Sequence, residues 1–307
     1  MRAQDSAIRP TAIAVGAQAT SSSTTVGSLL AASGVFAFSF SFPATAWALQ
    51  GFGPWSSTAL RGLLAAVTAA VCLLAARAPL PARRHWPGLL AVAGGCVLGF
   101  PLLTTFAVQA SSTAHTAVVV GLLPLCTAVV ATVRTGARPP RAFWVAALAG
   151  AAVVLAFTLQ QSHGSFSTAD LFLFAALAVC AVGYAEGGRL AKELPGWQVI
   201  AWGVLIALPV MLPAALLALA AEPVHLGWHA VTGLAYQGLV SQFGGFVVWY
   251  RGMGQIGVPK ASQFQLAQPL LTLVWATVLL GEHLTPAAPL TAVAVLGCIA
   301  ATQRARG

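Results

Sequence analysis

Amide side chains inside an apolar stretch are the residues of this sequence best placed to hold a solute. Gln263, Gln265 and Gln268 precede Pro269 in the run PKASQFQLAQPLLTLVWATVLLG, which contains a single charged residue. Because an amide without a partner in hydrocarbon costs several kcal/mol, each glutamine must face protein or water. Contact with a substrate and hydrogen bonding to a neighbouring helix are both open for each one. At about 100° per residue, Gln265 and Gln268 share a helix face, whereas Gln263 is offset from Gln268 by roughly 140°.

An internal repeat shows that this stretch can be built without amides. A shift of 145 residues places residues 124–136 over residues 269–281, and eight of the thirteen aligned pairs are identical. In the first copy, the positions of the three glutamines hold apolar residues, which are Val118, Val120 and Leu123. The amides are therefore additions to the second copy, and they point to a site that handles polar groups.

Prolines inside the apolar runs supply a second kind of polar group. Pro124 and Pro269 lack an N–H, so the carbonyls of Val120 and Gln265 lose their helical donors. Such carbonyls are tolerated where they line a cavity, and the same prolines could equally be kinks that shape helix packing. Both are candidates for gating, because a broken helix is a point at which a transporter can flex.

Aromatic residues near other breaks predict an apolar wall. Phe42 and Phe100 each precede a proline, and Tyr184 lies inside a later apolar run. We expect these three to contact a bound solute, although most aromatic side chains in such a chain face lipid or neighbouring helices. Trp249 and Tyr250 are expected in the aromatic belt at the membrane surface. With Gln242, the polar residue nearest the middle of its run, the predicted substrate-binding set is Phe42, Phe100, Tyr184, Gln242, Gln263, Gln265 and Gln268.

Ionisable residues inside the apolar runs are few. His115 and Lys260 occupy equivalent positions of the repeat and could guard opposite ends of a pathway, while Lys260 could also reach lipid headgroups. Glu186 and Arg189 are three residues apart, a spacing that favours a local ion pair. Arg61 lies deeper and needs a partner, either structural or an anionic group. Only His115 and Glu186 could carry a proton, so facilitated or weakly coupled transport is favoured. The predicted gating and coupling set is His115, Lys260, Glu186, Pro124 and Pro269.

Composition assigns the chain to the membrane proteins. Hydrophobic residues make up 58% of the 307 residues and charged residues 7%, far below the ~25% charged residues of a soluble domain. The net charge of +9 therefore does not indicate nucleic acid. The five cysteines show no C-x-x-C spacing, and we predict no metal site and no cofactor. The expected partners are the lipid bilayer and a small-molecule substrate, and the chain is expected to be a monomer or a weak homodimer.

Ten apolar runs are long enough to cross the ~30 Å hydrocarbon core as helices, which takes about 20 residues each. The predicted fold is therefore all-α and integral to the membrane, with ten transmembrane helices in two inverted five-helix repeats. We divide the chain into a disordered tail (1–25), a first repeat (26–160), a second, inverted repeat (161–303) and a short tail (304–307). The runs are 27–49, 54–76, 87–109, 113–133, 142–159, 168–190, 197–219, 228–250, 259–280 and 286–303.

Basic residues indicate how these runs are oriented. Fourteen of the fifteen lysines and arginines fall in the tails and at alternate connectors, and the exception, Arg61, lies within the second run. The positive-inside rule then places both termini in the cytoplasm of a multi-pass protein of the plasma membrane, here a bacterial inner membrane. Because five is odd, the second half must enter from the opposite side. Inverted repeats are typical of secondary transporters that alternate access to one midplane site.

The second half also contains a family pattern. The connector W-Y-R-x-M-x-x-I-G-x-x-K-A-S (249–262), followed by Pro269 and Gly281-Glu282, resembles the signature of the EamA branch of the drug/metabolite transporter superfamily. Arg61 fits the P-x-x-x-x-x-x-R pattern of the same family, and the aromatic-rich runs look most like its amino-acid exporters of the YddG type. The resemblance implies the ten-helix EamA fold, in which helices 1, 3, 4, 6, 8 and 9 surround a central cavity.

Together these features predict a secondary transporter that exports small amphipathic solutes by alternating access around a midplane cavity. Amino acids, both aromatic and other neutral ones, are the expected substrates. The alternative within the same fold is an exporter of drugs, nucleosides or other metabolites. The alternatives of other classes are a passive channel and an integral membrane enzyme, although no cluster of catalytic residues points to an enzyme.

Overall fold

The computed structural model describes residues 11–136, 140–161, 166–256, 264–265 and 267–304. Within this part of the chain all regular elements are helices. They are α1 (Thr11–Ser39), α2 (Ser41–Ala48), α3 (Pro54–Ala75), η1 (Arg83–His85), α4 (Trp86–Val92), η2 (Ala93–Gly99), α5 (Phe100–Ala110), α6 (Thr113–Val120), α7 (Leu123–Thr135), α8 (Arg141–Gln161), α9 (Thr168–Leu190), α10 (Gly196–Ala221), α11 (Trp228–Ala235), η3 (Tyr236–Gly244), α12 (Gly245–Ile256), α14 (Ala267–Leu280) and α15 (Ala287–Arg304).

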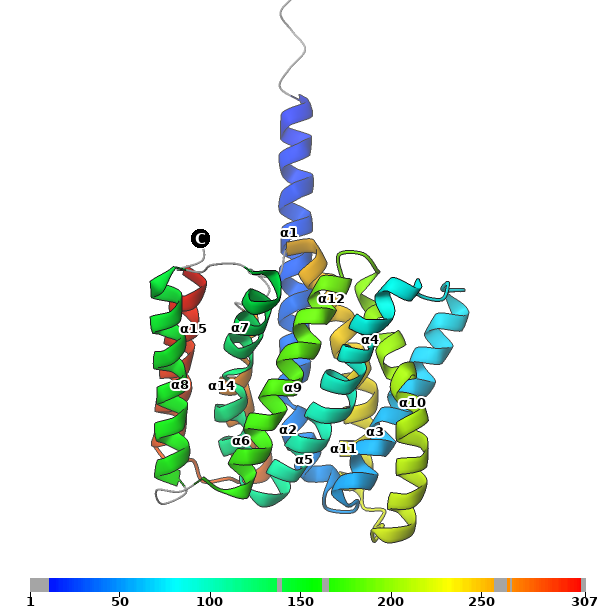
Figure 1. Ribbon diagram of the computed structural model, residues 1–307, viewed down its shortest axis with the longest axis vertical. Coiled ribbons are helices and arrows are strands. Elements are labelled where there is room, and N and C mark those ends of the chain that lie inside the picture. Colours follow the sequence, from blue (N-terminus) through cyan, green and yellow to red (C-terminus); the bar gives the residue numbers. More distant parts are fainter. Residues whose placement is uncertain (1–10, 137–139, 162–165, 257–263, 266, 305–307) are drawn as a thin grey trace, which may run out of the picture.

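The helices form a single bundle in which most axes run roughly side by side, with α8 and α15 at one edge and α3 and α10 at the other (Figure 1). Seven helical segments of the described chain are long and apolar enough to cross a membrane, and the helices Ala267–Leu280 and Ala287–Cys298 are apolar but shorter. The all-α prediction therefore holds for the described residues. The number of ten spans stays a prediction.

The first helix begins earlier than expected. α1 starts at Thr11 and projects beyond the upper end of the bundle in Figure 1, so residues 11–25 are helical rather than a disordered tail. The prediction rested on the polar composition of this stretch. However, the stretch contains no proline and only one glycine, Gly16, so little interrupts its backbone hydrogen bonds.

Helix contacts repeat when the two halves are exchanged. α1, the first helix of the first half, packs along α12 in the third segment of the second half. Correspondingly, α9, the first helix of the second half, packs along α4, η2 and α5 in the third segment of the first half. The second, fourth and fifth segments pack on their own counterparts, as α3 on α10, α6 on α14 and α8 on α15. This is the pattern expected of two related five-helix units in opposite orientation.

Two π-helical segments distort equivalent places in the two halves. η2 ends at Gly99 and η3 ends at Gly244, which are separated by the same 145 residues as the two copies of the repeat. A π-helix widens the turn and leaves the regular i→i−4 ladder, and such segments occur frequently at functional sites. The two distortions therefore follow the register of the repeat.

Acidic side chains cap the N-termini of two helices at the lower end of the bundle. Glu222, just after α10, accepts a hydrogen bond from the N–H of Ser56 at 2.8 Å, at the start of α3. Glu282, just after α14, accepts from the N–H groups of Thr113 and Ala114 at 2.9 and 3.0 Å, at the start of α6. These N–H groups have no partner within their own helix, and a carboxylate there also interacts favourably with the helix dipole. Each carboxylate therefore joins one half of the chain to the other.

Candidate functional site

A cavity lies where the two π-helical segments approach the break between α1 and α2. We call it the central cavity. Residues of both halves line it, namely Phe38, Ser41, Phe42, Thr45, Arg61, Cys96, Phe100, Pro101, Thr104, Leu123, Cys180, Tyr184, Ser241, Gln242, Phe246 and Gln268.

Aromatic rings form one wall of the central cavity. The ring of Tyr184 stacks on Phe246 with centroids 5.9 Å apart, and Phe38 packs edge-on against Phe246 at 5.0 Å. Phe42 is buried at 4% exposure, and Phe100 packs against the same core. Because the rings hold one another in place, this apolar wall exists before any ligand arrives.

Polar groups of the π-helical segments form another part of the wall. The side-chain amide of Gln242 in η3 donates to the carbonyl of Cys96 in η2 at 3.3 Å. The hydroxyl groups of Ser41 and Ser241 share a hydrogen bond at 2.6 Å, which joins α2 to η3. Gln242 therefore has a helix-bridging partner and a place at the cavity, so both interpretations of a buried glutamine apply to it.

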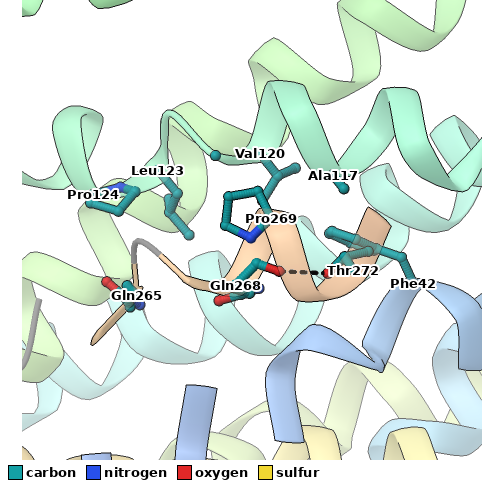
Figure 2. Close-up of a pocket in the computed structure, with 10 residues that line it drawn as sticks. Phe42, Ala117, Val120, Leu123, Pro124, Gln265, Gln268, Pro269 and Thr272 are labelled. Atoms are coloured by element: carbon teal, nitrogen blue, oxygen red, sulfur yellow. Dashed lines mark hydrogen bonds between the residues drawn. The ribbon is translucent and has the colours of Figure 1, made fainter. Parts of the chain in front are cut away.

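A second pocket adjoins the central cavity and shares Phe42, Leu123 and Gln268 with it. We call it the proline pocket. Figure 2 shows Pro124 on α7 and Pro269 on α14 along the same pocket, with Gln268 beside Pro269. The two prolines are equivalent in the repeat, so the pocket lies where the fourth segments of the two halves cross. Its lining is Phe42, Ala117, Val120, Gly121, Leu123, Pro124, Gln265, Gln268, Pro269 and Thr272.

The structure gathers most of the predicted binding residues. Those at the central cavity are Phe42, Phe100, Tyr184, Gln242 and Gln268. Gln265 lines the proline pocket together with Gln268, which agrees with the face that their spacing predicts. Gln263 and the gating candidate Lys260 lie outside the described residues. Substrate contact by any of these residues stays a prediction.

Two further gating candidates lie at opposite ends of the contact between α9 and the fourth segment. At the lower end, Nε2 of His115 lies 2.7 Å from Oδ1 of Asp170, and both side chains are buried. At the upper end, Glu186 pairs with Arg134 at 2.7 Å. The predicted ion pair between Glu186 and Arg189 is confirmed at 3.1 Å. Because side-chain contacts hold α9 at both of its ends, α9 stays packed against the α6–α7 segment along its length.

The break in the first segment has a direct partner on the other half. Pro43 lacks an N–H, so the carbonyl of Ser39, four residues earlier, has no helical donor. The hydroxyl of Thr272 on α14 donates to that carbonyl at 2.7 Å. The indole N–H of Trp275 donates to the Ser39 hydroxyl at 2.9 Å. The carbonyl freed by the proline thus ties α1 to α14 beside the proline pocket.

Comparison with known proteins assigns this architecture to a family. The sequence model of the EamA-like transporter family matches the chain twice, at residues 25–159 and 167–302. The two matches cover nearly the whole chain and have the extents of the two halves of the repeat. The chain belongs to the EamA-like transporter family.

Individual relatives agree with this assignment. "Uncharacterized transporter YdeK" of Bacillus subtilis (strain 168) is 42% identical over 271 residues, which are 88% of this chain and 94% of that protein. A solved crystal structure at 20% identity matches with a TM-score of 0.64, over 90% of this chain and 97% of its own, and shows that the fold is shared. This EamA-like protein is therefore a multi-pass membrane transporter, and the family assignment points away from an enzyme.

The predicted site of this EamA-like transporter was incomplete. Phe38 and Phe246 line the central cavity but lay outside the predicted binding set. Asp170, the partner of His115, carried a local signal only as part of the capping box Ser167-x-x-Asp170, which predicts a helix start and not a contact with α6. No sequence pattern predicted the two π-helical segments.

Proposed function

We propose that this transporter exports small amphipathic solutes, foremost neutral and aromatic amino acids, and works as a monomer or a weak homodimer. The observation that carries the proposal is the central cavity, which sets an aromatic wall beside hydroxyl and amide groups. A zwitterion with an apolar side chain needs both surfaces, because its ionic groups must exchange water for hydrogen bonds while its side chain leaves water.

The distribution of charge indicates the orientation of the bundle in the membrane. Arg134, Arg189 and Arg251 lie near the upper ends of their helices, whereas Glu222 and Glu282 lie at the lower end. By the positive-inside rule the upper end, with both termini, faces the cytoplasm of a bacterial inner membrane. Substrate then enters at the upper end and leaves at the lower end.

Alternating access is the mechanism that the paired helix contacts favour. Because the contacts of one half are repeated by the other, exchanging the conformations of the halves would close one end of the bundle and open the other. The broken first segment and the two π-helical segments supply places where such a change can bend the chain. We expect the solute gradient itself, or a weakly coupled proton, to drive the flux.

Counterflow in liposomes tests the proposal. The purified full-length protein is reconstituted into liposomes loaded with unlabelled phenylalanine, leucine or uridine, and uptake of the same solute in labelled form is followed. We expect accumulation of both amino acids, with roughly tenfold lower rates for Gln268→Leu and Phe42→Ala, since each removes a cavity contact worth about 1.4 kcal/mol. Gln109→Leu and Phe166→Ala are matched controls at exposed positions and should transport normally.

Other outcomes decide between the alternatives. Counterflow of uridine but not of the amino acids would favour an exporter of nucleosides or other neutral metabolites. An ion current across a planar bilayer, without saturable counterflow, would favour a passive channel. Unchanged amino-acid flux in both folded cavity variants would refute the assignment of the site.

A further inference from the structure

Arg61 is the feature of the central cavity that the proposed function leaves without a role. It lies on α3, its side chain is 7% exposed, and it lines the cavity. Its Nε has no hydrogen-bond partner, and within the described residues no ion pair or hydrogen bond engages its guanidinium. A buried cation without a counter-charge is costly in a membrane protein and is a sign of function.

The acidic residues of the described chain are all engaged elsewhere. The chain has six, of which Asp5 lies outside the described residues. The other five lie towards the two ends of the bundle and bind other groups. Asp170 binds His115, Glu186 binds Arg134 and Arg189, Glu193 binds His85 and Arg189, Glu222 binds the start of α3, and Glu282 binds the start of α6. None of these five carboxylates neutralises Arg61.

Backbone packing fixes the position of Arg61 instead. Gly238 of η3 lies against α3 so closely that a Cβ there would be 2.9 Å from the carbonyl oxygen of Arg61 and 2.7 Å from Cβ of Leu64. One turn earlier, the hydroxyl of Thr58 lies 3.4 Å from that of Thr105 on α5. α3 is thus held against η3 and α5 at the level of the cavity. The backbone of Arg61 is thus fixed beside the cavity, while its guanidinium has no hydrogen-bond or ion-pair partner in the described residues.

We propose that Arg61 binds the carboxylate of the transported solute. The guanidinium presents a planar set of donors that matches a carboxylate in two parallel hydrogen bonds. The aromatic wall around Tyr184 and Phe246 lines the same cavity and can receive an apolar group on the same molecule. The substrate class is therefore a carboxylic acid or zwitterion that carries an apolar group. This inference rests on the proposed function for the location of the site, and it adds the requirement for an acid group.

A pair of probes of equal shape tests the proposal. Binding of 3-phenylpropionate and of 3-phenylpropionamide to the full-length protein in detergent is measured by isothermal titration calorimetry. We expect the wild type to bind the acid at least about tenfold more tightly than the amide, because the carboxylate offers the guanidinium an opposite charge and two acceptor oxygens, whereas the amide is neutral and offers one. Arg61→Gln should abolish this preference. Arg251→Gln, an exposed arginine of α12, is the matched control and should keep it.

Several results would overturn the assignment of Arg61. They are equal affinities for the two probes in the wild type, binding of neither probe, and a preference for the acid that survives in Arg61→Gln. Arg61→Lys guards against misfolding, because it keeps the charge without the planar donors and should retain a reduced preference for the acid. If Arg61→Gln does not fold, the comparison of the wild type with Arg61→Lys decides.

The failure of this inference is distinguishable from failure of the proposed function. If phenylalanine and its amide exchange equally well in counterflow, the carboxylate site is wrong while transport stands. If phenylalanine does not exchange but the wild type still prefers 3-phenylpropionate, the amino-acid substrate is wrong while the acid site stands.

Discussion

The close contact between η2 and α9 allows a stringent test of the fold, in which each of two adjacent glycines of η2 is replaced by alanine. A Cβ added at Gly95 would overlap the carbonyl oxygen of Val179 and lie 3.1 Å from the nitrogen and 3.2 Å from the Cα of Gly183. All of these are backbone atoms of α9, so none can rotate away and the two segments must separate. At the neighbouring Gly94, a Cβ would meet no atom within 4 Å.

These distances set the expected energies of the two substitutions. Replacing glycine by alanine inside a helix gains about 0.5–1 kcal/mol from backbone entropy, and this gain applies to both positions. Forcing a methyl group into a packed contact costs about 1–3 kcal/mol, and this cost applies to Gly95→Ala alone. The variants should therefore differ by about 2 kcal/mol, which corresponds to roughly 4–8 °C in Tm at about 2–4 °C per kcal/mol. Gly94→Ala should melt at or above the wild-type temperature.

Thermal unfolding of the purified proteins in detergent, followed by circular dichroism, measures this difference. Counterflow measures its consequence for transport, because moving η2 displaces the Cys96 carbonyl that holds Gln242. We expect Gly95→Ala to lose transport and Gly94→Ala to keep it. If the two variants melt together and transport equally, η2 and α9 do not approach as closely as described here.

Three contacts between segments give further predictions, each checked by the same unfolding measurement. Glu282→Gln loses the charge at the start of α6 and should lower the free energy of unfolding by about 1.5–3 kcal/mol. His283→Gln, at the exposed neighbouring residue, should leave the stability unchanged. Equal Tm values for the two variants would argue against a stabilising role for the Glu282 carboxylate. Thr272→Val keeps its shape but stops donating to the carbonyl freed in the first segment, so a loss of about 0.6–1 kcal/mol is expected and wild-type stability would contradict that bond. Asp170→Asn removes the charge that the carboxylate presents to His115 and to the N–H and hydroxyl of Ser167, and it should cost about 1.5–3 kcal/mol; an unchanged Tm would exclude a stabilising role for this carboxylate.

The sequence alone predicted that the protein lies in a membrane, that it is helical and that its two halves are related. These predictions depend on local quantities, namely the length of each apolar run, its charge content and the recurrence of residues at a fixed shift. The bundle of helices and the two family matches agree with them. The ion pair between Glu186 and Arg189 was predictable for the same reason, because three residues of one helix separate its members.

Burial within the bundle was not readable in this way. Trp249 and Tyr250 were expected at the membrane surface, but they are 2% and 1% exposed. The expectation failed because α12 packs along α1, where Gly252 lies against the backbone of Ala31 and brings the helices together. An apolar run of aromatic residues fits a lipid surface and a helix interface equally well, so only the packing distinguishes them.

Partnership between charges also required the folded chain. Arg61 stood out as an ionisable residue inside an apolar run, and Glu282 stood out only as part of the family pattern. Glu282 accepts hydrogen bonds from two N–H groups of a helix 168 residues away, whereas the guanidinium of Arg61 donates none in the described chain. Sequence determines which groups are charged and how deep in a helix they lie. Which of them remains unpaired beside a cavity depends on contacts between segments that are distant in the sequence, because the packing of these segments determines which donors and acceptors can reach one another.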